Sequence, residues 1–344
     1  MLRTTRTGAA AACCQRFMAS LAALTLGAAV PTSTLAQAAP PASDTVQFIT
    51  LGTGGGPVIR RERSEPANAV KVGQSIYLFD IGAGTLRRMA EAGLATGQIK
   101  AIFLSHLHID HTADLAPFLL NRWVLNDYRK LPVFGPRGTA ATVGGIAQMS
   151  VPVRLAPVTI GGPRKPSFES THVVSQFTST MDHPTLIYFD EKLRVLAITN
   201  SHYNFAPGSA EARFSRSYAF RIEAGGKSYV YTGDTGMSDK LVELAHGADV
   251  LVSEVIDMAG IAETLNVSGT VPPNVLPALL AHMEHDHLTP TQIGEIARRA
   301  GVKRVVLTHL VPGNDGETEL TPYTRGLTER FAGPVVVAKD LDSF

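Results

Sequence analysis

The chain has 344 residues, of which 44% are hydrophobic and 18% are charged. This balance excludes an intrinsically disordered chain and leaves enough apolar residues for one large domain or two ordinary ones. The formal net charge of +1 at pH 7 excludes the strong basic field that attracts nucleic acid or an anionic membrane.

The first 38 residues have the organisation of a secretory signal peptide. Three arginines precede an apolar run, 17–30, which is followed by Ala36-Gln37-Ala38, a small-residue cleavage site. The run is too short to cross a bilayer as a permanent helix. We therefore predict that residues 1–38 are removed, and that the protein is exported to a periplasm or to the cell exterior without a stable membrane anchor. The alternative is an N-terminal segment that is retained, either without structure or as an anchor.

Both cysteines, Cys13 and Cys14, fall within the predicted signal peptide. The mature chain is therefore expected to have no disulfide, no thiolate ligand and no cysteine nucleophile, so a metal site must use His, Asp and Glu. Residues 39–46 are predicted to be a short linker. Because no repeat, low-complexity tract or change of composition follows, we expect residues 47–344 to form a single α/β domain.

Five predicted strands of the α/β pattern each end at a histidine or an aspartate. They are 76–79 before Asp80, 101–104 before a histidine cluster, 194–199 before His202, 229–231 before Asp234, and 304–307 before His309. Ligand sites in α/β folds gather at the carboxyl ends of strands, where loops vary above a rigid sheet. We therefore expect these side chains to lie close together.

The best-marked helix is predicted directly before the last of these strands. Thr289, Pro290 and Gln292 supply an N-cap, a proline at the first helical position and a capping-box glutamine. Gly301 is typical of a helix C-terminus. His287 lies just before the N-cap, in a loop from which its side chain could lean over a site.

The segment 105–111 contains the pattern His-x-His-x-Asp-His, formed by His106, His108, Asp110 and His111. Alternate residues of extended backbone point the same way, so His106 and His108 can bind one ion. After a bend, Asp110 and His111 can face a second ion. Imidazole and carboxylate ligands without sulfur favour zinc, with manganese and iron as alternatives. The sequence thus predicts two divalent metal ions.

This motif resembles that of the metallo-β-lactamase superfamily, and further signatures follow in the family's order over residues 47–312. The resemblance implies an αββα four-layer sandwich, a single catalytic domain with the metal site at the edge of its sheets. Asp80 would orient the histidine cluster from behind the ligands. The implied ligands are His106, His108 and His202 for one metal, Asp110, His111 and His309 for the other, and Asp234 as the bridge.

Within the superfamily, the chain is most similar to the ribonuclease Z and arylsulfatase-like branch. The similarity lies in the segments 51–56, 134–139, 249–254 and 287–289. By this resemblance, His287 is a catalytic histidine and Glu254 is a partner that contacts it. The implied activity is hydrolysis of an ester bond, in which Asp110 and Asp234 hold metal and His287 either donates a proton to the leaving group or stabilises an oxyanion.

Three features of the sequence argue against RNA as the substrate. An exported protein is separated from cytoplasmic transfer-RNA precursors. Residues 217–231 leave no room for the long arm of bacterial ribonuclease Z enzymes, and a near-neutral chain gains little from counterion release. We therefore predict a small-molecule substrate and no nucleic acid, with an aryl sulfate, a phosphate ester or a phosphate diester as the substrate. The alternatives are a carboxylic ester, lactone or lactam hydrolase, and a non-catalytic exported protein that binds metal or ligand; a homodimer is compatible with the sequence.

Five further histidines match no position of the family: His172, His183, His246, His282 and His285. We expect each of them to lie at the surface or to serve packing. We also expect Glu284 and Asp286, which lie beside two of them, to be solvated charges.

Overall fold

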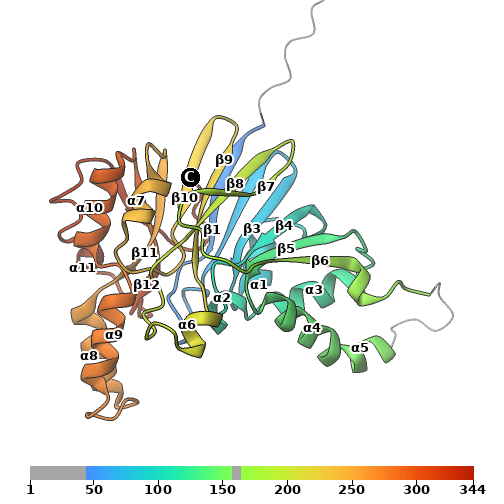
Figure 1. The fold of residues 1–344 in the computed structure, drawn as a ribbon, viewed down its shortest axis with the longest axis horizontal. Helices are drawn as coiled ribbons and strands as arrows, with labels where there is room; N and C mark the ends of the chain where they lie inside the picture. Colours follow the sequence, from blue (N-terminus) through green and yellow to red (C-terminus); the bar gives the residue numbers. More distant parts are fainter. Residues whose placement is uncertain (1–43, 157–163) are drawn as a thin grey trace, which may run out of the picture. The chain divides into compact units, whose positions relative to one another are not determined.

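Two mixed β-sheets form the centre of the fold (Figure 1). The computed structural model describes residues 44–156 and 164–344. The first sheet has the strand order β1-β2-β3-β4-β5-β6, with β1 (Val46–Gly52), β2 (Ala67–Val72), β3 (Ser75–Ile81), β4 (Ile99–Phe103), β5 (Leu131–Pro136) and β6 (His172–Phe177). The second has the order β13-β12-β11-β10-β9-β8-β7, with β7 (Thr185–Phe189), β8 (Leu193–Thr199), β9 (Tyr218–Ala224), β10 (Lys227–Tyr231), β11 (Val250–Ile256), β12 (Val305–Val311) and β13 (Val335–Val337).

The strand directions explain why the predicted site residues meet. In the first sheet, β1, β2 and β3 are antiparallel neighbours, whereas β3 to β6 are parallel. In the second sheet, β10 to β13 are parallel, and two antiparallel steps give β8 the same direction as β10. The carboxyl ends of β3 and β4 therefore share one edge of their sheet, as do those of β8, β10 and β12.

Alternation along β3 determines the layers on either side of it. Tyr77 and Phe79 pack between the two sheets, where Phe79 stacks on Phe103 with ring centroids 4.8 Å apart. Ile76 and Leu78 point the other way, into the layer that contains the helices. All of these side chains are buried, as expected for a strand that is covered on both faces.

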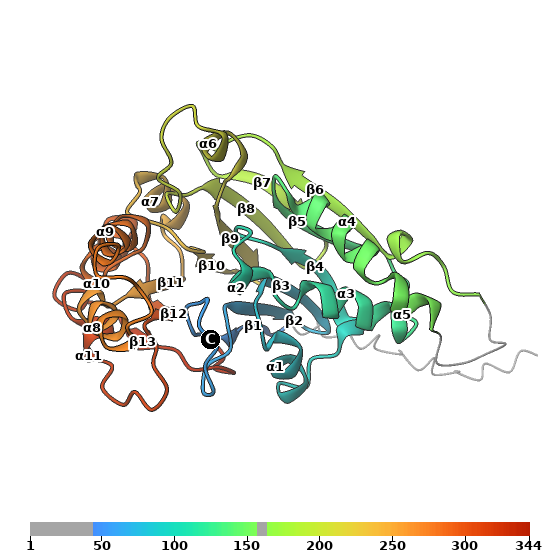
Figure 2. The ribbon, with the colours of Figure 1, turned by 90° about the horizontal axis from the view of Figure 1, so that it is seen from below.

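Helices cover the outer face of each sheet and complete four layers (Figure 2). Phe118 and Ile146 pack against the first sheet, and Leu244 and Ile296 pack against the second. The predicted αββα sandwich is therefore confirmed. The helices are α1 (Thr85–Glu91), α2 (Ile109–Thr112), α3 (Leu115–Val124), α4 (Thr139–Met149), α5 (Val151–Leu155), α6 (Ala210–Phe214), α7 (Asp239–Ala245), α8 (Met258–Ser268), α9 (Leu276–Asp286), α10 (Pro290–Ala300) and α11 (Thr321–Thr324).

The five predicted strands are present within β3, β4, β8, β10 and β12, and the predicted helix is α10 with its capping box. Two boundaries differ, because Asp80 lies inside β3 and His309 lies inside β12, instead of beyond the end of the strand. The register of β11 against β12 is irregular here, so that Ser253 pairs with Leu307 but Val255 pairs with Leu310. The extra residue on β12 forms a bulge, a device that re-aims a side chain beside a site. His309 accordingly has a φ of 44°.

The predicted signal peptide, 1–38, lies outside the described residues, so the boundaries at 38 and 46 stay predictions. The described residues belong to one compact unit, which is consistent with a single domain. Within 44–156 and 164–344, no helix combines the length and the apolar character needed to cross a membrane.

Candidate metal centre

The seven predicted ligands converge where the carboxyl ends of the strands of both sheets meet. The segment after β4 makes the first contribution, because His108 is the extended N-cap residue of the short helix α2, which then carries Asp110 and His111 in one turn. This is the bend that the sequence predicted. The seven residues are His106, His108, Asp110 and His111 after β4, His202 after β8, Asp234 after β10, and His309 within β12.

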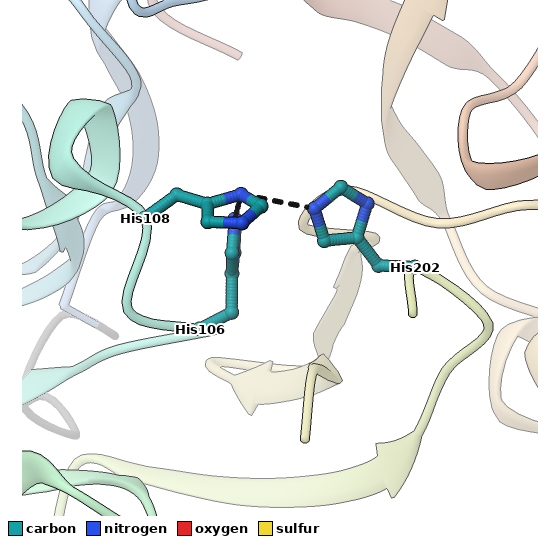
Figure 3. A group of neighbouring side chains, drawn as sticks. All are labelled: His106, His108 and His202. Carbon is teal, nitrogen blue, oxygen red and sulfur yellow. Dashed lines mark hydrogen bonds between the residues drawn. The ribbon is translucent and has the colours of Figure 1, made fainter. Parts of the chain in front are cut away.

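Three imidazoles form one half of the centre (Figure 3). His108 Nδ1 lies 3.0 Å from His106 Nε2 and 3.1 Å from His202 Nε2. Nitrogen ligands of tetrahedral zinc lie about 2.0–2.1 Å from the metal and hence roughly 3.3 Å from one another. The three nitrogens are therefore spaced as ligands of one ion.

Asp110, His111, Asp234 and His309 form the other half, and all four are buried. His111 Nε2 lies 3.2 Å from Asp234 Oδ1, and His309 Nε2 lies 3.2 Å from Asp234 Oδ2. Asp110 Oδ2 lies 3.5 Å from His111 Nε2 and 3.6 Å from His309 Nε2. Two carboxylates and two imidazoles thus face one another at distances typical of a shared cation.

Asp234 connects the two halves, because its Oδ2 atom also lies 3.9 Å from both His106 Nε2 and His202 Nε2. Among the described residues, Asp234 Oδ1 and the Nε2 atoms of His111 and His309 are buried without a hydrogen-bond partner. Unpaired buried polar atoms are costly. Metal ions would satisfy these atoms together, so the residues present fit a centre of two ions.

The electrostatics of both halves suit cations. Burial lowers the pKa of His106 well below its usual value and lowers that of His202 to about 3, which keeps both imidazoles in the neutral form that binds metal. Burial also acts to lower the pKa of His309, but the carboxylates of Asp234 and Asp110 outweigh it and raise this pKa to about 10. These carboxylates favour a positive charge beside them, which a proton or a metal ion can supply.

Asp80 holds the cluster from behind, as the sequence predicted. Its Oδ2 atom accepts hydrogen bonds from Ser105 Oγ at 2.7 Å and from the Tyr231 hydroxyl at 2.8 Å, and it lies 2.8 Å from His111 Nδ1. Its Oδ1 atom accepts the Ser105 backbone N–H at 2.7 Å. Donation from His111 Nδ1 leaves Nε2 of that ring for metal. The sequence did not indicate Ser105 and Tyr231; alternation along β10 puts Tyr231 on the same side as Tyr229, and in the structure both join Phe79 in the core between the sheets.

The predicted pair of Glu254 and His287 is in contact. His287 Nδ1 lies 2.6 Å from Glu254 Oε2, and the Glu254 side chain is fully buried. The His287 ring lies 5.1 Å from the ring of His202 and 5.9 Å from that of His309, so it borders both halves of the centre. Burial acts to lower the pKa of His287, but the Glu254 carboxylate outweighs it and raises this pKa. The catalytic role of the pair stays a prediction.

A cavity of about 310 Å³ is lined by His287 and by several of the seven ligands. Helix α9 supplies another part of its wall through Leu279, His282 and Met283. The sequence contains a signal for this helix, because the apolar residues Leu276, Leu279, Leu280 and Met283 recur at helical spacing.

One expectation about α9 is confirmed and one is wrong. His282 is exposed, as expected of a surface histidine, and it also lines the cavity of the metal centre. Asp286 is not solvated, because it is completely buried. The error arises because the sequence does not reveal that the C-terminal end of α9 packs against the loop of His202, whose Nδ1 atom lies 3.1 Å from the Asp286 carbonyl oxygen.

Comparison with known proteins agrees with this geometry. Residues 77–310 match the family described as beta-lactamase superfamily domain. Ribonuclease Z of Mycobacterium bovis (strain BCG / Pasteur 1173P2) is 30% identical over 303 residues, which make up 86% of this chain and 96% of that protein. Ribonuclease Z of Mycolicibacterium gilvum (strain PYR-GCK) is 30% identical over 275 residues, or 78% of this chain and 85% of that protein.

Solved structures share the fold. The metallo-beta-lactamase fold protein YhfI from Bacillus subtilis covers 87% of this chain and 98% of its own, with a TM-score of 0.60 at 19% identity. The short form of human tRNase Z covers 87% of this chain and 98% of its own, with a TM-score of 0.56 at 21% identity. At these identities the likeness shows the fold alone.

The prediction of a small-molecule substrate and no nucleic acid is wrong, since the relatives that match 86% of the chain at 30% identity are named ribonuclease Z. The charge argument failed because the net charge of a chain says little about a site where metal ions can hold a phosphate. The short connection between β9 and β10 is present as expected, but it did not decide the substrate class.

Fold, ligand geometry and relatives therefore agree on the chemistry. The two ligand groups meet at Asp234, and the matched family covers the segment from Tyr77 to Leu310 that contains all of them. The chain belongs to the metallo-β-lactamase superfamily and is a metal-dependent hydrolase that acts on ester bonds.

Proposed function

We propose that this protein is a phosphodiesterase that cleaves RNA. The observation that carries the proposal is the pair of ligand groups joined at Asp234 with His287 and Glu254 beside them, all around one cavity or directly behind it. The ribonuclease Z relatives, which this chain matches over most of their length, supply the substrate class. Together with the predicted export, this proposal puts the RNA substrate outside the cytoplasm.

The metal-binding residues would hold two divalent ions, and their imidazole and carboxylate ligands favour zinc. Such ions supply a nucleophilic water and neutralise the charge of the attacked phosphate. Asp234 keeps the two ligand groups together, because its carboxylate faces both of them. Asp80 fixes the ring of His111 through Nδ1, so that only Nε2 points into the centre.

His287 is proposed to act on the leaving group. When the bond between phosphorus and the leaving nucleoside oxygen breaks, that oxygen needs a proton. Glu254 faces Nδ1 of His287 and raises the pKa of this imidazole, which favours the protonated ring whose Nε2 proton is available for transfer. The buried carboxylate of Glu254 is kept in place by the backbone N–H of Thr235, which donates to Oε1.

The test is hydrolysis by zinc-loaded protein of a labelled RNA oligonucleotide, a transfer-RNA precursor transcript, an aryl sulfate and an aryl carboxylic ester. We expect RNA cleavage that disappears with chelator and in His108→Ala, because His108 supplies a ligand nitrogen between two others. His183→Ala is the control, since its side chain is 82% exposed and lies outside the centre. Turnover of the sulfate or the carboxylic ester with no cleavage of either RNA would overturn the proposal.

A further inference from the structure

Besides the metal ligands and His287, the cavity of the metal centre is lined by His282, which the proposed reaction does not use. His282 and Met283 line this cavity from α9, together with Leu279 one turn earlier. The His282 side chain is 57% exposed, whereas that of His287 is 13% exposed. His282 therefore lies at the mouth of the cavity, and His287 lies deeper, beside the ligands.

A buried carboxylate positions this histidine. Asp286 follows one helical turn after His282, and its Oδ2 atom lies 2.7 Å from His282 Nδ1. The Asp286 side chain has no exposed surface, and neither of its oxygens makes a hydrogen bond within the described residues; the approach of His282 Nδ1 is a close contact without hydrogen-bond geometry. A buried carboxylate without a partner is costly, so Asp286 and the Nδ1 atom of His282 are held together. The Nε2 atom of His282 remains for a ligand.

The distances resemble those of the deeper pair, although only the deeper pair has the geometry of a hydrogen bond. His287 Nδ1 faces the buried Glu254 at 2.6 Å, and His282 Nδ1 faces the buried Asp286 at 2.7 Å. Both histidines line the same cavity. Two imidazoles, each next to a buried carboxylate, thus line one substrate-sized cavity, one near the ligands and one at its mouth.

We propose that His282 binds a phosphate of the RNA strand next to the phosphate that is cleaved, and that Asp286 positions it for this contact. This inference rests on the proposed function. The scissile phosphate has to lie at the ligand cluster, and the strand that carries it has to leave the cavity through its mouth. Each flanking nucleotide brings one negative phosphate to that opening, where an oriented imidazole N–H can donate to it. Leu279 and Met283 offer apolar surface to the intervening sugar.

The experiment compares two substrates that differ in the number of phosphates. An RNA oligonucleotide has flanking phosphates, whereas bis(p-nitrophenyl) phosphate has one phosphate and no flank. In His282→Ala we expect KM for the oligonucleotide to rise about tenfold with kcat within threefold, because one charge-assisted hydrogen bond is lost. Hydrolysis of bis(p-nitrophenyl) phosphate and the zinc content should remain as in the wild type. His282→Lys should recover part of the KM, since it restores a phosphate-binding donor.

His285→Ala is the matched control, because His285 is also exposed on α9 but does not line the metal cavity. His285→Ala should leave KM and kcat unchanged for both substrates. Asp286→Asn should raise the oligonucleotide KM in the same direction as His282→Ala. An unchanged oligonucleotide KM in His282→Ala, or an equal loss on both substrates, would overturn this inference alone. Absence of oligonucleotide cleavage by the wild type would overturn the proposed function and this inference with it.

Discussion

Replacement of Asp80 by asparagine tests how the metal centre is held together. The carboxylate accepts from three donors at Oδ2, namely Ser105 Oγ, the Tyr231 hydroxyl and His111 Nδ1, and from one backbone N–H at Oδ1. An asparagine can accept the hydrogen bonds of only one of the two carboxylate oxygens, because its NH₂ group must face a donor in either orientation. The less costly orientation places the NH₂ group against the Ser105 N–H.

The magnitude follows from these contacts. One hydrogen bond to a charged group, worth about 1.5–3 kcal/mol, is lost, and three others lose their charge assistance. We expect the metal-free variant to lose roughly 3–5 kcal/mol of unfolding free energy. Because Asp80 no longer fixes the ring of His111, zinc affinity should fall about 10–100-fold. Urea unfolding of chelator-treated protein and competitive zinc titration measure the two effects.

Asp190→Asn is the control for this experiment. Its carboxylate also accepts four hydrogen bonds, two from the hydroxyls of Tyr77 and Tyr188 and two from the backbone N–H groups of Lys192 and Leu193. It belongs to none of the groups that can hold a metal. It should destabilise the fold and leave zinc affinity within twofold of the wild type. Wild-type zinc affinity in Asp80→Asn, or an equal loss of affinity in Asp190→Asn, would refute the reasoning.

Three further predictions follow from the same structure. His287→Ala should lower kcat for RNA by about 10²–10⁴-fold with unchanged zinc content, because it removes the proton donor; a drop confined to KM would contradict this role. Removal of metal by a chelator should lower the unfolding free energy, by about 2.7 kcal/mol relative to zinc at 100 times its Kd, and re-addition of zinc should restore it; identical melting curves would argue against a metal site in the folded state. Burial acts to raise the pKa of Asp127, but hydrogen bonds from Arg129 and Arg122 outweigh it and lower this pKa to about 2. Since the folded pKa is depressed, the stabilisation is present above the unfolded pKa of about 3.9 and is lost as the pH falls towards 2. Asp127→Asn should therefore cost roughly 1–2 kcal/mol at pH 6 and less at pH 3 in urea unfolding, and a cost that does not depend on pH would contradict the assignment.

The sequence by itself determined the elements whose signals are local. Strand alternation and glycine-rich turns located the five strands, and a capping box with Gly301 located α10. The ligand cluster after β4 was readable because its four residues lie within six positions of one another. The resemblance to the metallo-β-lactamase superfamily predicts the remaining ligands, Asp80, and the pair of Glu254 and His287, and the structure brings these residues together.

Tertiary structure alone decided the contacts between segments far apart in the chain. The Tyr231 hydroxyl reaches Asp80 across 151 positions, and the bulge that re-aims His309 exists only because β12 pairs with β11. The sequence indicates a solvated charge for Asp286 and a surface or packing role for His282, because nothing near them indicates which surface covers α9. The packing of this helix against the loop of His202 buries Asp286 and brings His282 to the cavity. The burial of a side chain and its contacts with distant residues depend on how the sheets and helices pack, and neither the net charge nor the local sequence pattern determines that packing.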